Sequence, residues 1–336
     1  MSARAFEGLT QLEEIRFEHS HLWNISSYAI SNLQNLKILG FIGSTIHNVE
    51  GHAISELPNL QQLVFNQCNI GEFDTKAIHI LRTRNLPITS DCHATTRGNN
   101  NNHDERVMKN MMDRSRLSPT DNHLPVNGSR LIFYNSNIST IGNTAIESDI
   151  FAFLVIAGST FTHLKENAFK VELNNQCEIS LLELIQNKIE KLHADSFAHV
   201  SGKQSATHKT YFLMNNNTFD RVATNGFRFH PTLEVYMISS NKFICSCSKL
   251  HWYFASVRTA TSGATTRRQM IEESLSSSST CVSDDSKLED FLVNCSGDET
   301  TEHPWTSRTS GFNRANDWLV TVVVFFIVLK NVLVIK

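Results

Sequence analysis

Cysteines are the residues of this 336-residue chain whose spacing most plainly suggests chemistry. Cys245 and Cys247 stand two positions apart, and Cys281 and Cys295 follow them further along the chain. This set suits either disulfides, which would clamp a segment with little core of its own, or a thiolate metal site. Because no histidine and no second close cysteine pair stands at metal-ligand spacing, we expect disulfides and no metal. Disulfides persist in oxidising compartments, so the set predicts a secreted protein.

Five Asn-x-Ser/Thr sites agree with secretion, because such sites accept glycans on exposed loops of secreted proteins. An Asn- and Ser-rich chain also collects these sites by chance, so we expect some to carry no glycan. The candidate glycosylation sites are Asn24, Asn127, Asn137, Asn216 and Asn294.

Catalytic and nucleic-acid-binding patterns are missing from the sequence. The 15 histidines are scattered, and neither a Gly-rich phosphate loop nor a Gly-x-Ser-x-Gly motif occurs. The net charge is −3 without a basic stripe, which argues against nucleic acid as a partner. We therefore expect no enzymatic activity and no cofactor.

A repeat must position these residues. Leu9, Leu33, Leu57 and Leu81 stand 24 residues apart, and the apolar residues between them recur in register. Within one unit Leu39 and Phe41 alternate as in a short strand, whereas the following apolar residues are spaced by three and four, which favours a loose or short helical return. The pattern predicts an α/β solenoid of stacked units that share one core.

The repeat resembles the extracellular leucine-rich repeat family. Ser20, Ser44 and Cys68 occupy the position at which that family places an inward asparagine, and later units have Asn there. Such a side chain must satisfy buried backbone groups of neighbouring turns, and Cys68 is accordingly expected to be a buried free thiol. The resemblance implies a leucine-rich repeat horseshoe of about eight turns.

The segment from Asn241 to Trp252 resembles the cysteine-rich C-terminal cap of the same family. That resemblance implies that Cys245 pairs with Cys281 and that Cys247 pairs with Cys295. Cys92 and Cys177 lie in irregular segments and could pair with each other, but the sequence does not set their connectivity.

The chain divides into six segments. Repeats at 1–85 and 130–243 flank an Asn-rich insertion at 86–129, which is either a tolerated surface loop or a processing or partner-gating loop. Because Met1 falls inside a repeat, we expect the intact solenoid to begin before it. After the repeats come the cap at 244–296, a stalk at 297–317 and a hydrophobic tail at 318–336.

The tail predicts attachment to a membrane. Its run between the charged residues Asp317 and Lys330 is 12 residues, whereas a spanning helix needs about 20. One interpretation is a glycolipid (GPI) anchor signal, and the other is a single-pass helix with Lys330 reaching the interface. The candidate anchor region contains Ser307, Ser310, Gly311 and Asn313.

The outward residues of the strands form the candidate binding site. They alternate with the inward ones, and from the second unit onward they are mostly apolar, as at interaction surfaces, although strand propensity favours similar residues. The predicted partner-binding concave face contains Ile38, Ile42, Val64, Ile132, Tyr134, Val155, Leu181, Ile185, Tyr211, Leu213, Val235 and Met237. Replacing Val155 and Leu213 by Glu is expected to abolish binding without unfolding the chain.

Tethered repeats with such a cap resemble cell-surface adhesion proteins of the connectin and chaoptin type. The resemblance implies a membrane-tethered protein-binding module for adhesion or recognition at the extracellular face of the plasma membrane. Its partner would be another protein, with a second copy on an apposed cell as one candidate. The alternative is a ligand-binding receptor or co-receptor ectodomain, as in Toll-like receptors, that serves innate-immune or developmental signalling without its own signalling domain.

Overall fold

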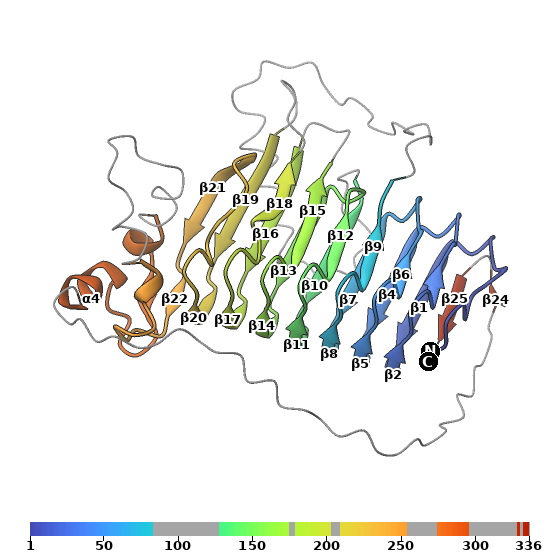
Figure 1. The fold of residues 1–336 in the computed structure, drawn as a ribbon, viewed down its shortest axis with the longest axis horizontal. Coiled ribbons are helices and arrows are strands. Elements are labelled where there is room, and N and C mark those ends of the chain that lie inside the picture. The colour runs from blue at the N-terminus through green and yellow to red at the C-terminus, as the bar shows by residue number, and fades with distance from the viewer. Residues whose placement is uncertain are drawn as a thin grey trace.

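The computed structural model describes residues 1–82, 128–174, 179–202, 209–253, 274–295, 328–329 and 332–335. Within these residues the chain winds into a stack of turns, and its strands form three mostly parallel sheets with little helix (Figure 1). Backbone hydrogen bonds between strands join neighbouring turns along the stack. This stack of mostly parallel strands is the solenoid-like repeat that the sequence predicted.

Sheet A, the ten-stranded sheet, takes the first strand of each turn. Its strands from the repeats are β1 (Glu14–Glu18), β4 (Ile38–Ile42), β7 (Gln62–Asn66), β10 (Arg130–Tyr134), β13 (Phe153–Ala157), β16 (Ile179–Ile185), β19 (Lys209–Asn215) and β21 (Leu233–Ser239). The 24-residue period keeps them in register, so that Leu39 lies opposite Leu63 and Phe41 opposite Phe65.

The returns of the turns form the remaining two sheets, and the cap adds β23 to the edge of one of them. Sheet B contains β2 (His21–Ile25), β5 (Thr45–Val49), β8 (Asn69–Phe73), β11 (Asn137–Ile141), β14 (Thr160–Leu164), β17 (Lys188–Leu192), β20 (Thr218–Val222), β22 (Lys242–Phe243) and β23 (Thr280–Cys281). Sheet C contains β3 (Ile30–Ser31), β6 (Ile54–Ser55), β9 (Ile78–Ile80), β12 (Ile146–Ser148), β15 (Phe169–Leu173) and β18 (His199–Gly202).

The predicted helical returns are wrong, because these segments are strands. The misleading signal was the three-residue spacing of Ile46 and Val49, both of which are buried. The register of β5 with β8 includes Ile46, Asn48 and Val49 but passes over His47. When a strand is irregular at its middle residue, two side chains three positions apart can both point inward. In a regular element that spacing indicates a helix.

The corner between sheets A and B uses one residue in the left-handed region in each turn. These residues have φ between 47° and 61°, and they are His19, Gly43, Gln67, Asn135, Gly158, Gln186, Asn216 and Ser240. Most are not glycine, although this region is unfavourable for other residues. Gly, Asn and His, the types that tolerate this region best, hold five of the eight positions, whereas Gln67, Gln186 and Ser240 are kept in it by the stacking of the turns.

Stacked phenylalanines fill the centre of the first repeats. The rings of Phe17, Phe41, Phe65 and Phe133 follow one another at centroid distances of 4.9, 5.0 and 5.1 Å, with nearly parallel planes. All four side chains are almost fully buried. Since one turn could not bury such a ring alone, the ladder makes each turn depend on its neighbours.

Inward polar side chains form a second ladder, as predicted. The Ser44 hydroxyl accepts from the backbone N–H of Ser20 at 3.1 Å and donates to the Phe17 carbonyl at 3.1 Å. Cys68 is a buried free thiol whose Sγ donates to the Phe41 carbonyl at 3.2 Å. Burial raises the pKa of this thiol to about 11, so it remains protonated, and the prediction for Cys68 is confirmed.

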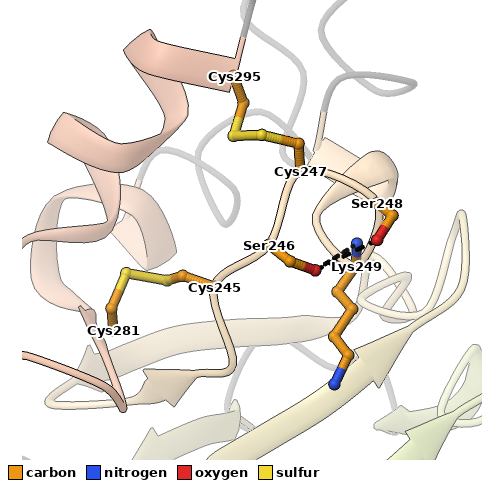
Figure 2. The surroundings of a disulfide bond; sticks show 7 residues. All are labelled: Cys245, Ser246, Cys247, Ser248, Lys249, Cys281 and Cys295. Atoms are coloured by element: carbon orange, nitrogen blue, oxygen red, sulfur yellow. Dashed lines mark hydrogen bonds between the residues drawn. A yellow bond between two sulfur atoms is a disulfide. The ribbon is translucent and has the colours of Figure 1, made fainter. Parts of the chain in front are cut away.

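The cap covers the far end of the stack. Cys245 is bonded to Cys281 and Cys247 to Cys295, the pairing that the family resemblance implied (Figure 2). The first disulfide joins the chain after β22 to β23, and the second joins it to the end of α4 (Leu288–Cys295). Trp252, which belongs to the cap, is buried with its ring 4.9 Å from that of Phe227 in the last repeats. These bonds replace the metal interpretation of the four cysteines.

Part of the hydrophobic tail lies at the opposite end. The strand β25 (Val332–Ile335) pairs in parallel with β1 and antiparallel with β24 (Val328–Leu329), and Figure 1 shows it beside the first turn. Among the helices that the structure describes, none is both long and apolar enough to cross a membrane.

Several predicted features lie outside the described residues. They are Cys92, Cys177, Asn127, nearly all of the insertion, the stalk, and the anchor candidates Ser307, Ser310, Gly311 and Asn313.

Candidate functional site

The outer face of sheet A contains the predicted binding residues, but they differ in surroundings. Ile38, Ile42 and Val64 are half-buried near the N-terminal end. Most of those further along meet in one apolar cluster, separate from the main core. This sheet A cluster contains Ala152, Phe153, Leu181, Tyr211 and Leu213, with Val155, Ile185 and Met237 packed against them.

Strand register explains the cluster. Phe153 lies opposite Leu181, which lies opposite Tyr211. Leu213, two residues after Tyr211 on the same face of β19, lies opposite Met237, because the register of β19 with β21 shifts after Phe212. Because neighbouring strands are about 4.8 Å apart, large side chains at matching positions pack against one another.

Four predicted residues are more buried than the sequence suggested. Leu213 is 1% exposed, Leu181 5%, Tyr211 7% and Ile132 8%. They form the base of the face rather than its contact surface. The half-buried Val155, Ile185, Met237 and Tyr134 remain partly accessible, and Val235 is 39% exposed. The Leu213→Glu test is therefore unsuitable, since it would bury a charge and endanger the fold.

Two buried charged residues adjoin the cluster. Arg130 places its guanidinium 5.7 Å from the centroid of the Phe153 ring, and burial lowers the pKa of that guanidinium. Glu183 lies between Val155 and Leu213 in the strand register and is also buried. Sequence reasoning missed Phe153 and Arg130, although extending the outward alternation back from Val155 through β13 would have found Phe153.

The candidate glycosylation sites have different surroundings. The Asn24 amide is half-buried and donates from Nδ2 to Glu50 at 2.5 Å and to Ser26 at 3.3 Å. Asn137 and Asn216 are exposed. Asn294 lies in α4, and its side chain is outside the described set. Glycan attachment at Asn24 would break hydrogen bonds to partly buried groups, whereas Asn137, whose amide makes one exposed 3.4 Å hydrogen bond to Asn69, and Asn216 are open to modification.

Ionic contacts on sheet C centre on Glu147. Its carboxylate lies 2.7 Å from Lys170 Nζ, 3.5 Å from Lys76 Nζ and 3.2 Å from His79 Nδ1. Burial alone would raise the pKa of Glu147, but Lys170, Lys76 and His79 together lower it. These contacts link three successive turns, so we interpret them as structural.

The described part of the chain contains no group of three or more His, Cys, Asp or Glu side chains suited to hold a metal ion. Comparison of the chain with models of protein families, with curated proteins and with solved structures found no match.

Proposed function

We propose that this protein is an extracellular protein-binding module that acts in cell adhesion or cell-surface recognition. The sheet A cluster is the observation that carries the proposal. Val155, Ile185 and Met237 present apolar surface over a buried base that contains Phe153 and Tyr211, and aromatic and Met side chains are enriched at the centres of interfaces. The partner is another protein, with a second copy on an apposed cell as the first candidate to test.

The proposed fold is a leucine-rich repeat horseshoe of about eight turns, with the sheet A cluster on its concave face. The 24-residue period, the inward Ser and Asn ladder and the cysteine-paired cap support it. The two disulfides also support an oxidising, extracellular location.

Attachment to the plasma membrane through the C-terminal tail completes the proposal. Its support is the apolar composition of the tail. Since β25 pairs with β1 in the folded chain, insertion of the tail into a membrane requires this strand to leave the edge of sheet A. Treatment of expressing cells with a phosphatidylinositol-specific phospholipase tests the anchor, because it releases a glycolipid-linked chain and leaves a spanning helix in place.

The binding test displays the full chain on cells and measures cell aggregation and partner binding. The variant V155N/I185N removes apolar contact surface from partly exposed positions without adding charge or a glycosylation site. We expect it to weaken binding about tenfold or more, because two apolar contacts at an interface centre are lost. Trp23→Ala is the control, since Trp23 is 77% exposed on sheet B. Unchanged binding by a folded V155N/I185N protein would contradict the proposed site.

A further inference from the structure

A group of basic side chains on sheet B lies away from the sheet A cluster. His163 and Lys165 come from one turn, at and just after the end of β14, and Lys191 and His193 come from the next turn, around β17. His163 lies opposite Lys191 in the strand register, and the two imidazole centroids are 5.8 Å apart. We call these four residues the His/Lys cluster.

The lysines of the cluster differ from other lysines of sheet B. Lys188 Nζ lies 3.2 Å from Glu190 and Lys242 Nζ lies 2.7 Å from Asp285, so both already have carboxylate partners. Within the part of the chain that the structure describes, no such ion pair involves Lys165 or Lys191, and both side chains are half-buried. Neither ammonium group therefore has a carboxylate at ion-pair distance among these residues, and the nearby Glu72 and Glu190 act on the cluster only at longer range.

Unsatisfied imidazole nitrogens occur at the same place. His163 Nδ1 and His193 Nε2 are shielded from solvent, and neither has a hydrogen-bond partner. Buried polar atoms are nearly always hydrogen-bonded, so such atoms call for an explanation. A ligand that brings acceptor oxygens would pair with the two ammonium groups, and the shielded imidazole N–H groups would join these contacts once the rings turn outward.

The electrostatics agree with an anionic ligand. Burial, followed by the charges of Lys165, His163 and Lys191, lowers the pKa of His193 to about 4. Burial, Lys191 and Lys165 also lower the pKa of His163, against a smaller opposing effect of Glu190. The imidazoles are therefore neutral at pH 7, and a bound anion would offset the positive field and raise both pKa values.

We propose that the His/Lys cluster binds the sulfate esters of an anionic glycan. Ammonium and imidazole donors from two adjacent turns suit a tetrahedral oxyanion, to which charge-assisted hydrogen bonds are strong. Arg221 lies opposite Lys191 on β20 and continues the row, which suits an extended polyanion. The choice of a glycan rests on the extracellular location in the proposed function, whereas the site itself does not depend on the sheet A cluster.

The test measures binding of a heparin-derived hexasaccharide to the purified full chain at physiological salt. The variant K165Q/K191Q removes both cluster ammonium groups, and K188Q/K242Q removes the same charge from lysines already paired with carboxylates. We expect K165Q/K191Q to weaken binding about tenfold or more, since each charge-assisted contact contributes roughly that factor. The control pair should stay within about threefold of the wild type, because general attraction at long range is screened. Melting temperatures establish that both variants are folded.

A second readout is the His193 pKa, followed by NMR of its ring protons. Saturating hexasaccharide should raise that pKa by about one unit or more. Equal losses in the two double variants, or an unchanged His193 pKa, would overturn the proposal. Binding of inositol hexaphosphate without binding of the hexasaccharide would overturn the assignment to sulfated glycans. V155N/I185N should bind the hexasaccharide normally, so failure here is distinguishable from failure of the protein-binding proposal.

Discussion

The side-chain oxygen of Asn217 accepts two hydrogen bonds from Asn187, one from its backbone N–H and one from its Nδ2, each at 3.0 Å. Asn217 Nδ2 in turn donates to the Leu184 carbonyl at 2.8 Å, and the backbone N–H of Asn217 donates to Asn241 Oδ1 at 3.0 Å. Asn187 and Asn217 are almost fully buried. Each asparagine therefore holds together the backbones of neighbouring turns.

Truncation of Asn217 should be strongly destabilising. Asn217→Ala leaves the buried backbone N–H of Asn187 and the Leu184 carbonyl without their partner, which costs roughly 1–3 kcal/mol for each group. Asn217→Ser should cost less, because Ser159 at the equivalent position accepts the N–H of Ser136 at 3.1 Å. Urea unfolding of the three proteins checks this order, and equal losses for Ala and Ser would contradict it.

Removal of one cap disulfide should lower stability while the repeats still fold. For C245S/C281S, whose bridge closes a segment with a sequence separation of 36 residues, the free energy of unfolding should fall by about 2–5 kcal/mol. Thermal unfolding followed by circular dichroism measures the loss. Cys68→Ser is the control, because Ser44 and Ser136 already occupy this ladder position in adjacent turns; a comparable loss in that variant would show that the assay does not report on the cap.

The stability of the fold should fall as the medium becomes mildly acidic. His193 has a folded-state pKa of about 4, against an ordinary value of 6.5, so the unfolded chain binds its proton first. The stabilisation from neutral His193 is complete above about pH 6.5 and is lost as the pH falls toward about 4. Denaturant unfolding at pH 7 and pH 5 should show a smaller loss for His193→Gln than for the wild type, and identical losses would argue against this assignment.

Glycan occupancy should follow exposure. When the chain is expressed in secretory cells, Asn137→Gln and Asn216→Gln should each lower the apparent mass on a denaturing gel by that of one glycan. Both amides are exposed and are therefore expected to carry a glycan in the wild type. Asn24→Gln should leave mobility unchanged, since that amide is half-buried and bonded to Glu50. Digestion with a glycosidase that removes N-linked glycans should bring all variants to the same position.

The sequence predicted the parts of the fold that repeat in register. Leu39 and Phe41 indicated an inward strand face, and the polar residue after each strand indicated a ladder, because both follow from side-chain alternation and from the need to satisfy buried backbone groups. The prediction that the returns are helical was wrong, because a strand that is irregular at His47 spaces Ile46 and Val49 as a helix would.

Burial on the outer face of sheet A was harder to predict. Alternation shows that Leu213 points outward, but its near-complete burial depends on neighbours such as Tyr211 and Met237 and on the register shift at Phe212. The His/Lys cluster was missed for a related reason. His163 and Lys191 are far apart in the sequence, and only exact phasing of β14 against β17 brings them together.

The direction of the backbone hydrogen bonds has a mechanical consequence. Because they run from turn to turn along the stack, a force that pulls the first turn away from the cap loads the turns in series once β25 has left β1, and single turns should detach one after another. One 24-residue turn releases roughly 80 Å of extended chain. The disulfides Cys245–Cys281 and Cys247–Cys295 prevent the segment between each pair of bonded cysteines from extending. Under tension the oxidised protein would therefore lengthen in a series of steps while its cap remained closed.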